Sequence, residues 1–248
     1  MKICVAQTRA EKVNIRSNIR NHLNWINAAI NHSADLIVFP ELSITGYEPA
    51  LAKDLATMQN DSMFDQFQVI SNTNDIAIGI GLPVKSRSGI FISMLIFQAG
   101  KNRKSYLKQL LHPDELSYFE QGSGQIILDV ANRKIAPAIC YESLQEEHSN
   151  KAVELGADLY VASVAKSRKG IEKAFLHFPE LAIKHSIPVL MANCAGYCDN
   201  FECGGRTSVW DPFGRLLGQL SDKSEGILVY DTDTNELYKE EENSTNRS

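Results

Sequence analysis

No stretch of the sequence contains eighteen consecutive apolar residues, the length that would suggest a membrane-spanning helix. The first residues, Met1 to Gln7, read as the start of a strand and lack the positively charged and then apolar pattern of a secretory signal. The five cysteines are odd in number and lack the spacing of a disulfide framework, which suits a reducing compartment. We therefore expect a soluble cytoplasmic protein without a membrane partner.

The sequence also has no excess of positive charge, no internal repeat and no linker. Its 25 lysines and arginines are outnumbered by 30 aspartates and glutamates, and the net charge of −5 argues against binding nucleic acid. With 248 residues, of which 44% are hydrophobic, the chain is long enough to bury the core of one α/β domain. We assign that domain to residues 1–232. Residues 233–248 have little apolar content and are expected to form a flexible polar tail.

Apolar runs of strand length alternate along the chain with amphipathic segments of helical spacing. Strands are expected at residues 2–8, 34–39, 76–84, 90–98, 125–130, 134–140, 158–163, 188–193, 207–210, 216–220 and 226–230. Helices are expected at residues 15–30, 61–72, 144–155 and 170–186. Pro179 should kink the last helix or start a second segment, because proline removes a backbone donor. This alternation predicts an α/β fold.

Three residues with reactive side chains end or closely follow such strand-like runs. Glu41 comes after the run at 34–39, Lys108 follows a short strand, and Cys140 ends the run at 134–140. In open α/β folds, ligands collect at the carboxyl ends of strands. A lone cysteine is most often a buried structural residue. Here a carboxylate, that of Glu41, and an ammonium group, that of Lys108, also follow strand-like runs. Their presence favours a reactive role for Cys140 instead.

These residue types meet the needs of acyl transfer by a cysteine without a histidine. The thiolate is the nucleophile, so a base must take the thiol proton. A carboxylate whose pKa is raised by burial can do this, and we assign that role to Glu41. Attack on an amide carbonyl builds negative charge on oxygen, which a fixed ammonium and a backbone N–H would stabilise. Lys108 and the N–H of Tyr141 fit these two roles.

Four local patterns occur in an order that makes a highly specific signal. They are Phe39-Pro40-Glu41-Leu42 followed by Thr45-Gly46-Tyr47; Lys108 with Glu115, Phe119 and Gly122; Ile139-Cys140-Tyr141-Glu142; and Ala192-Asn193 leading to Gly205-Arg206-Thr207-Ser208 and Asp211-Pro212-Phe213-Gly214. In these patterns the sequence resembles the amidase-like branch of the nitrilase, or carbon–nitrogen hydrolase, superfamily. The resemblance implies a four-layer αββα sandwich and a Glu–Lys–Cys triad in which Glu115 holds the lysine and aids hydrolysis. It also implies a homodimer or higher homo-oligomer, with no metal or organic cofactor.

The resemblance further implies a hydrolase of carbon–nitrogen bonds other than peptide bonds. Cys140 would attack an amide carbonyl, release ammonia or an amine and leave a thioester for water to hydrolyse. Nitrilases of the superfamily usually carry tryptophan after the cysteine, whereas this chain carries Tyr141, which favours an amide over a nitrile. The expected substrate is a small ω-amide or N-carbamoyl compound that bears a carboxylate. Nitrile hydrolysis and a catalytically silent binding protein of the same fold are the alternatives.

Residues near the expected site allow two interpretations each. Lys166 and Arg168 follow the strand at 158–163 and could hold a substrate carboxylate or simply form a solvated surface. Tyr47, Phe119 and Phe201 could line the substrate pocket or belong to ordinary packing.

Cysteines and histidines elsewhere give weaker signals. Cys194, Cys198 and Cys203 have spacings of four and five and no nearby histidine, which does not make a four-ligand zinc site, so no metal is expected. Some histidines could pair with the nucleophile, but none lies in a recognisable sequence context: His112, His148, His177 and His185.

Overall fold

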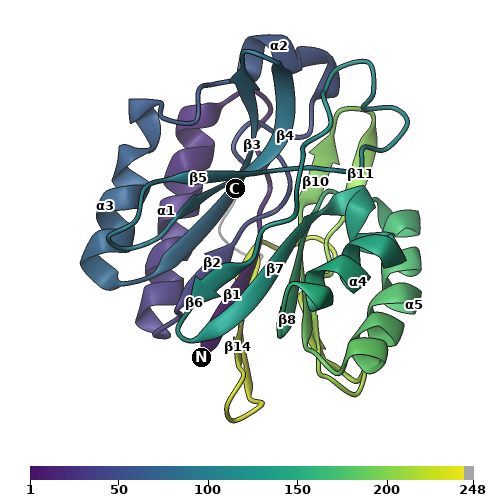
Figure 1. The fold of residues 1–248 in the computed structure, drawn as a ribbon. Coiled ribbons are helices and arrows are strands. Elements are labelled where there is room, and N and C mark those ends of the chain that lie inside the picture. Colours follow the sequence, from purple (N-terminus) through teal and green to yellow (C-terminus); the bar gives the residue numbers. More distant parts are fainter. Residues whose placement is uncertain (243–248) are drawn as a thin grey trace.

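Two β-sheets lie face to face, and helices cover the outer face of each sheet (Figure 1). The structure is a computed structural model and describes residues 1–242. One apolar layer lies between the two sheets, and a further layer lies between each sheet and its helices. This is a four-layer αββα sandwich, so the fold that the resemblance implied is confirmed.

The first sheet has seven strands in the order β15-β14-β1-β2-β3-β4-β5. Its strands are β1 Lys2–Gln7, β2 Leu36–Val38, β3 Ala77–Ser86, β4 Gly89–Phe97, β5 Lys104–Leu107, β14 Gly226–Asp231 and β15 Leu237–Glu241. Strands β1, β2 and β3 are parallel to one another. The expected antiparallel pairing of the runs at 76–84 and 90–98 is confirmed by β3 and β4, in which Leu82 lies opposite Ser93.

The second sheet has six strands in the order β13-β12-β9-β8-β7-β6. Its strands are β6 Leu128–Val130, β7 Arg133–Ile139, β8 Leu159–Val164, β9 Val189–Asn193, β12 Ser208–Trp210 and β13 Leu216–Gln219. Strands β7, β8 and β9 are parallel, so their carboxyl ends share one edge of the sheet. A separate small hairpin consists of β10 Ala195–Cys198 and β11 Phe201–Gly204.

Helices pack on the two outer faces because each has one apolar side. The α-helices are α1 Ile15–Asn31, α2 Ala52–Leu55, α3 Asp65–Asn74, α4 Glu146–Glu154 and α5 Arg168–His185, and the 3-10 helices are η1 Pro49–Leu51, η2 Ser62–Phe64 and η3 Cys140–Leu144. Helices α1 and α3 cover the first sheet, and α4 and α5 cover the second (Figure 1). Helix α5 continues through Pro179 without a second segment.

The alternation within β1 shows how the layers form. Ile3 and Val5 belong to the apolar layer between the sheets, whereas Cys4 and Ala6 belong to the layer under the helices. Successive side chains of a strand point to opposite faces, so a strand covered on both sides must be apolar throughout. The apolar runs in the sequence therefore mark these strands well.

Three features differ from the sequence-based expectations. Residues 237–241 form β15, which pairs with β14, so this part of the expected tail belongs to a sheet. The last part of the expected tail, residues 243–248, lies outside the described residues. The β10–β11 hairpin was not expected, and Cys194 and Cys203 form a disulfide. Among the described residues, no helix is long and apolar enough to cross a membrane.

Candidate active site

Glu41, Lys108 and Cys140 meet where the ends of the two sheets face each other. Glu41 lies beyond the end of β2, Lys108 directly follows β5, and Cys140 directly follows β7. Strands β2 and β5 belong to the first sheet and β7 to the second, so the site requires both sheets. Ser163 of β8 ties the sheets together here, because its Oγ donates to the carbonyl oxygen of Phe39 at 2.8 Å.

A glycine in β3 allows the backbone around Glu41 to lie directly on the first sheet. The N–H of Ile44 donates to the carbonyl oxygen of Gly81 at 3.0 Å. A Cβ atom at Gly81 would overlap the backbone of Pro40 and Leu42. Only glycine leaves room for this close approach of two backbones.

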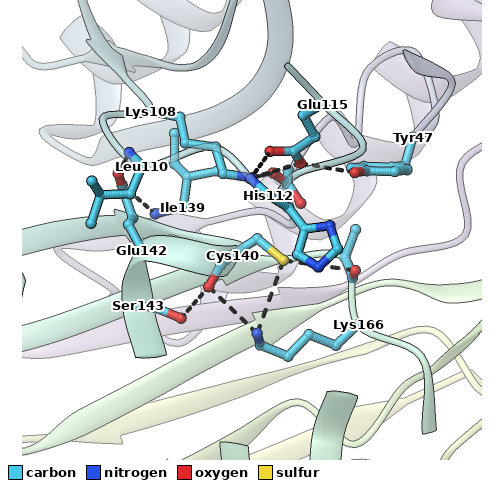
Figure 2. Close-up of polar contacts among 12 residues, drawn as sticks. Tyr47, Lys108, Leu110, His112, Glu115, Ile139, Cys140, Glu142, Ser143 and Lys166 are labelled. Carbon is cyan, nitrogen blue, oxygen red and sulfur yellow. Dashed lines mark hydrogen bonds and ion pairs between the residues drawn. The ribbon is translucent and has the colours of Figure 1, made fainter. Parts of the chain in front are cut away.

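Lys108 is fully buried between two carboxylates (Figure 2). Its Nζ lies 2.7 Å from Oε1 of Glu41 and 2.7 Å from Oε1 of Glu115. Glu115 is fixed in turn by the Tyr47 hydroxyl, which donates to Oε1 at 2.8 Å, and by the His112 N–H, which donates to Oε2 at 2.8 Å. The ammonium group therefore has a single well-defined position.

Burial and neighbouring charges act in opposite directions on these groups. Burial lowers the pKa of Lys108, but the carboxylates of Glu41 and Glu115 outweigh it and raise that pKa above its ordinary value. Burial raises the pKa of Glu41 to about 7, although Lys108 acts in the opposite direction. Oε2 of Glu41 is buried without a partner at hydrogen-bonding distance, yet the Cys140 thiol is close enough to lower the carboxyl pKa. Glu41 thus combines a raised pKa with an oxygen available to a nearby proton.

Cys140 begins η3 in a strained backbone conformation, with φ at +48°. Burial and the Glu41 carboxylate raise the pKa of its thiol to about 11, against the effects of Lys166 and Lys108. Sγ lies 4.0 Å from Nζ of Lys166, and the same Nζ donates to the Cys140 carbonyl oxygen at 3.4 Å (Figure 2). The thiol is therefore protonated at neutral pH and lies among cations that can stabilise its ionised form.

A cavity of about 500 Å³ opens onto this cluster. The expected residues that line it are Tyr47, Glu115, Cys140, Tyr141 and Lys166. Its volume suits a small-molecule ligand.

Two residues expected to contact the substrate lie elsewhere. Phe119 is buried in the apolar layer between the sheets and does not line the cavity. Arg168, the first residue of α5, has a side chain that is 81% exposed and forms a 3.5 Å ion pair with Asp222. Proximity in sequence to Lys166 was misleading, because the turn into α5 takes successive side chains in different directions.

Comparison with known proteins identifies the family. The family model described as Carbon-nitrogen hydrolase matches residues 2–239. The chain belongs to the carbon–nitrogen hydrolase family. It is therefore an enzyme, a carbon–nitrogen hydrolase.

This hydrolase is similar to proteins with related but different names. It is 27% identical to the 2-oxoglutaramate amidase of Bacillus subtilis, over 88% of this chain and 85% of the relative. It is 24% identical to a probable nitrilase of Schizosaccharomyces pombe, over 93% and 88% of the two chains. A variant of the amidase from Nesterenkonia sp. AN1 in complex with butyramide has the same fold, with a TM-score of 0.85, 24% identity, and 95% and 92% of the chains covered.

A third buried glutamate at the site of the hydrolase, Glu142, joins the chain segments that carry Lys108 and Cys140. Oε1 of Glu142 accepts from the Ile139 N–H at 2.7 Å and from the Tyr106 hydroxyl at 2.6 Å. Its Oε2 accepts from the Gln109 N–H at 2.7 Å. Sequence reasoning quoted Glu142 within a family pattern and gave it no role.

Further residues of the cavity were also missed. Lys173 and His177 of α5 line it. Their four-residue spacing places both on one face of a helix, which could have been read from the sequence. Phe201 of the small hairpin, which was expected as a wall of the pocket, also lines the cavity.

Proposed function

We propose that the hydrolase cleaves the amide bond of a small carboxylate-bearing compound, either an ω-amide or an N-carbamoyl compound, with Cys140 as the nucleophile. The observation that carries this proposal is the meeting of a carboxylate, an ammonium group and a thiol beside a cavity of about 500 Å³ that Cys140 lines. A protonated thiol beside an unpartnered carboxylate oxygen is the arrangement that general-base attack requires.

The first half of the reaction forms a thioester. Glu41 takes the thiol proton while Sγ of Cys140 attacks the amide carbon. The difference between pKa values of about 11 for the thiol and about 7 for the carboxyl group means that the proton leaves as attack proceeds rather than beforehand. Lys108 and the N–H of Tyr141 stabilise the oxyanion. The C–N bond then breaks, and Glu41 returns the proton to the departing ammonia or amine.

The second half returns the enzyme to its starting state. Water attacks the thioester carbon, Glu41 takes a proton from that water, and the C–S bond breaks. The departing sulfur receives the proton, and the product leaves as a carboxylic acid. Glu115 keeps Lys108 in place throughout, through the 2.7 Å contact between Nζ and Oε1.

The charge of the cavity supports an acidic substrate. Lys166 and Lys173 line it and provide two ammonium groups that could bind a carboxylate. The amidase similar to this chain from Bacillus subtilis is named for 2-oxoglutaramate, an amide that also carries a carboxylate. The butyramide complex in the Nesterenkonia fold relative shows that a neutral small amide can occupy that protein, so charge preference must be measured in this one.

A panel of small amides and nitriles, with ammonia detection, tests the reaction class. Amide hydrolysis by the wild-type protein and its loss in Cys140→Ala are expected. Mass spectrometry should detect an acyl group on Cys140 during turnover. Ammonia release from nitriles alone would favour the nitrilase alternative, and no turnover of any compound by a protein that binds them would favour a silent binding protein.

A matched pair of substrates tests the acidic group. For an acidic amide, Lys173→Ala should lower kcat/KM by about ten- to a hundredfold, the equivalent of a charge-assisted contact of about 1.5–3 kcal/mol. A neutral amide of equal length should be nearly unaffected. Arg168→Ala is the control, because that side chain lies outside the cavity lining. Equal losses on both substrates would contradict carboxylate binding by Lys173.

A further inference from the structure

Three cysteines gather on the small hairpin beside the catalytic cavity. Cys194 directly precedes β10, Cys198 ends β10, and Cys203 lies in β11. All three are buried, and their sulfur atoms lie within 4.8 Å of one another. Within residues 1–242, this is the only group of three or more cysteine, histidine or acidic side chains close enough to share one metal ion.

The spacing of the sulfur atoms suits coordination once they are reduced. Cys194 and Cys203 are joined as a disulfide, and Sγ of Cys198 lies 3.1 Å from that of Cys203 and 3.9 Å from that of Cys194. Zinc–thiolate bonds of about 2.3 Å place ligand sulfurs about 3.8–4.0 Å apart. The pair formed by Cys194 and Cys198 already has this separation. Opening the disulfide would need only side-chain movement at Cys203.

The surroundings favour a cation over three free thiolates. The carboxylates of Glu48, Glu41 and Asp199 place negative charge near the Cys198 sulfur. These charges attract a metal cation. The three cysteine sulfur atoms provide the ligands, so Glu41, Lys108 and Cys140 do not need to bind the ion.

We propose that the reduced hydrolase binds one thiophilic divalent ion, of the Zn²⁺ type, through the thiolates of Cys194, Cys198 and Cys203. A dithiol reductant supplies two electrons and two protons, becomes a disulfide itself, and breaks the bond between Cys194 and Cys203. Binding then forms three metal–sulfur bonds and releases three protons to solvent. Disulfide and metal are therefore alternative cross-links of one hairpin, and soft sulfur ligands select ions of this class.

This site lies next to the substrate cavity without belonging to its lining. Phe201, between Cys198 and Cys203 in the hairpin, lines that cavity and contacts the ring of Tyr47 edge-on, with centroids 5.7 Å apart. Either cross-link would hold this wall of the cavity in place. The proposal does not depend on which amide the enzyme cleaves.

Cadmium titration of a Cys140→Ala background tests the site, because this background removes the accessible catalytic thiol. After reduction with a phosphine and removal of excess reductant, Cd²⁺ should bind at one ion per chain with thiolate-to-metal charge-transfer absorption. Adding Cys198→Ser should weaken binding by more than about tenfold, since even loss of an outer-shell partner weakens metal sites 10- to 100-fold. Cys4→Ser is the control and should bind like its parent.

The oxidised parent provides a comparison that needs no variant of the cluster. With Cys194 and Cys203 in a disulfide, it should give no charge-transfer signal with Cd²⁺, and Zn²⁺ should raise the Tm of only the reduced protein. Equal Cd²⁺ binding by the oxidised and reduced forms would overturn the proposal. So would unweakened binding by the Cys198→Ser variant, or absence of a stoichiometric signal in the reduced parent.

Discussion

At the scale of single residues, the site is controlled by a carboxyl group whose environment both raises and limits its pKa. Burial raises the pKa of Glu41 to about 7, and the nearby Lys108 ammonium prevents a larger rise. An acid with this pKa is divided between its two forms near neutral pH. Glu41 can therefore accept a proton and return it within one catalytic cycle, which a carboxyl group with the ordinary pKa would do less readily.

The pH dependence of kcat/KM should report this group. The proposed mechanism needs ionised Glu41, so kcat/KM should fall about tenfold for each pH unit below about 7 and level off above it. Initial rates across pH 5–9, with a substrate that does not titrate there, provide the measurement. In Glu41→Gln the activity should be nearly absent, and the residual kcat/KM should no longer fall below about pH 7. If the residual activity of that variant still fell in the same way, the titrating group would be another residue.

A positioning role is predicted for Glu142, which touches neither the cavity nor the substrate. Glu142→Gln replaces one accepting oxygen with an NH₂ group that cannot accept the N–H bonds of Gln109 or Ile139. Loss of one charge-assisted bond corresponds to about 1.5–3 kcal/mol. We expect kcat to fall about ten- to a hundredfold with KM little changed.

Two measurements separate this role from general damage to the fold. Tyr106→Phe removes the 2.6 Å hydroxyl bond to Glu142, together with the contacts of that hydroxyl with His148 and the Gln109 side chain, but leaves both backbone N–H bonds to the carboxylate. It should give a smaller loss of kcat in the same direction. Glu146→Gln, at an exposed ion pair of α4, is the control and should leave kcat unchanged. If Glu142→Gln alters Tm but leaves kcat intact, its hydrogen bonds serve stability alone.

At the scale of elements, the strand ends that carry the site were predictable and the parts that surround it were less so. Continuous apolar runs mark strands buried on both faces, so β2 and β7 were found together with the residues that follow them. Strand β15, Leu237–Glu241, was missed because its side chains are mostly polar and backbone pairing with β14 defines it. The small hairpin was missed because its strands have only four residues each and both contain a glycine.

The same limit applies to the cavity. Glu41, Lys108 and Cys140 could be placed from strand ends and family patterns, since these depend on local sequence. Phe119 was assigned from a family pattern and Arg168 from its place after the strand at 158–163, whereas the cavity wall depends on which helix face and which hairpin pack nearby. Such long-range packing leaves no local signal in a single sequence.

A glycine prediction belongs to this scale because it concerns the contact between β3 and the loop after β2. Gly81→Ala places a Cβ against the backbone of Pro40 and Leu42, so the loop that carries Glu41 must move. We expect kcat/KM to fall by at least about a hundredfold, since a displacement of about 1 Å can reduce rates that much. Gly79→Ala is the control, because its Cβ meets only the flexible side chain of Met94 and one valine. Equal kcat/KM values for Gly81→Ala and Gly79→Ala would contradict the idea that the position of the loop depends on the absence of a Cβ atom at residue 81.

At the scale of the whole molecule, an exposed apolar area on α5 suggests how two copies could associate. Leu176 and Ile183 are 74% and 58% exposed, and Phe213 is 73% exposed in a turn that lies against α5. Residues seven apart on a helix share one face. Clustered exposed apolar side chains often mark interfaces, so we propose that this hydrolase forms a homodimer through α5.

Light scattering during size-exclusion chromatography tests the dimer. The wild-type protein should have twice the mass of one chain, and Ile183→Glu should lower it to one, because a charge would be buried at the interface. Val69→Glu, at an equally exposed apolar position on α3, is the matched control and should keep the wild-type mass. A monomeric wild-type protein, or a dimer in both variants, would contradict an interface at α5.

The hydrogen bond between Ser163 and Phe39 joins the two sheets. Glu41 and Lys108 are 67 residues apart, and Cys140 comes from the opposite sheet, so the site closes several long loops at once. Contacts between residues far apart in sequence form slowly, because their loops lose entropy before the contact forms. During refolding from denaturant, helical circular dichroism should therefore recover before amide hydrolysis does. In this enzyme, the rate at which activity returns would report the rate at which one sheet packs against the other.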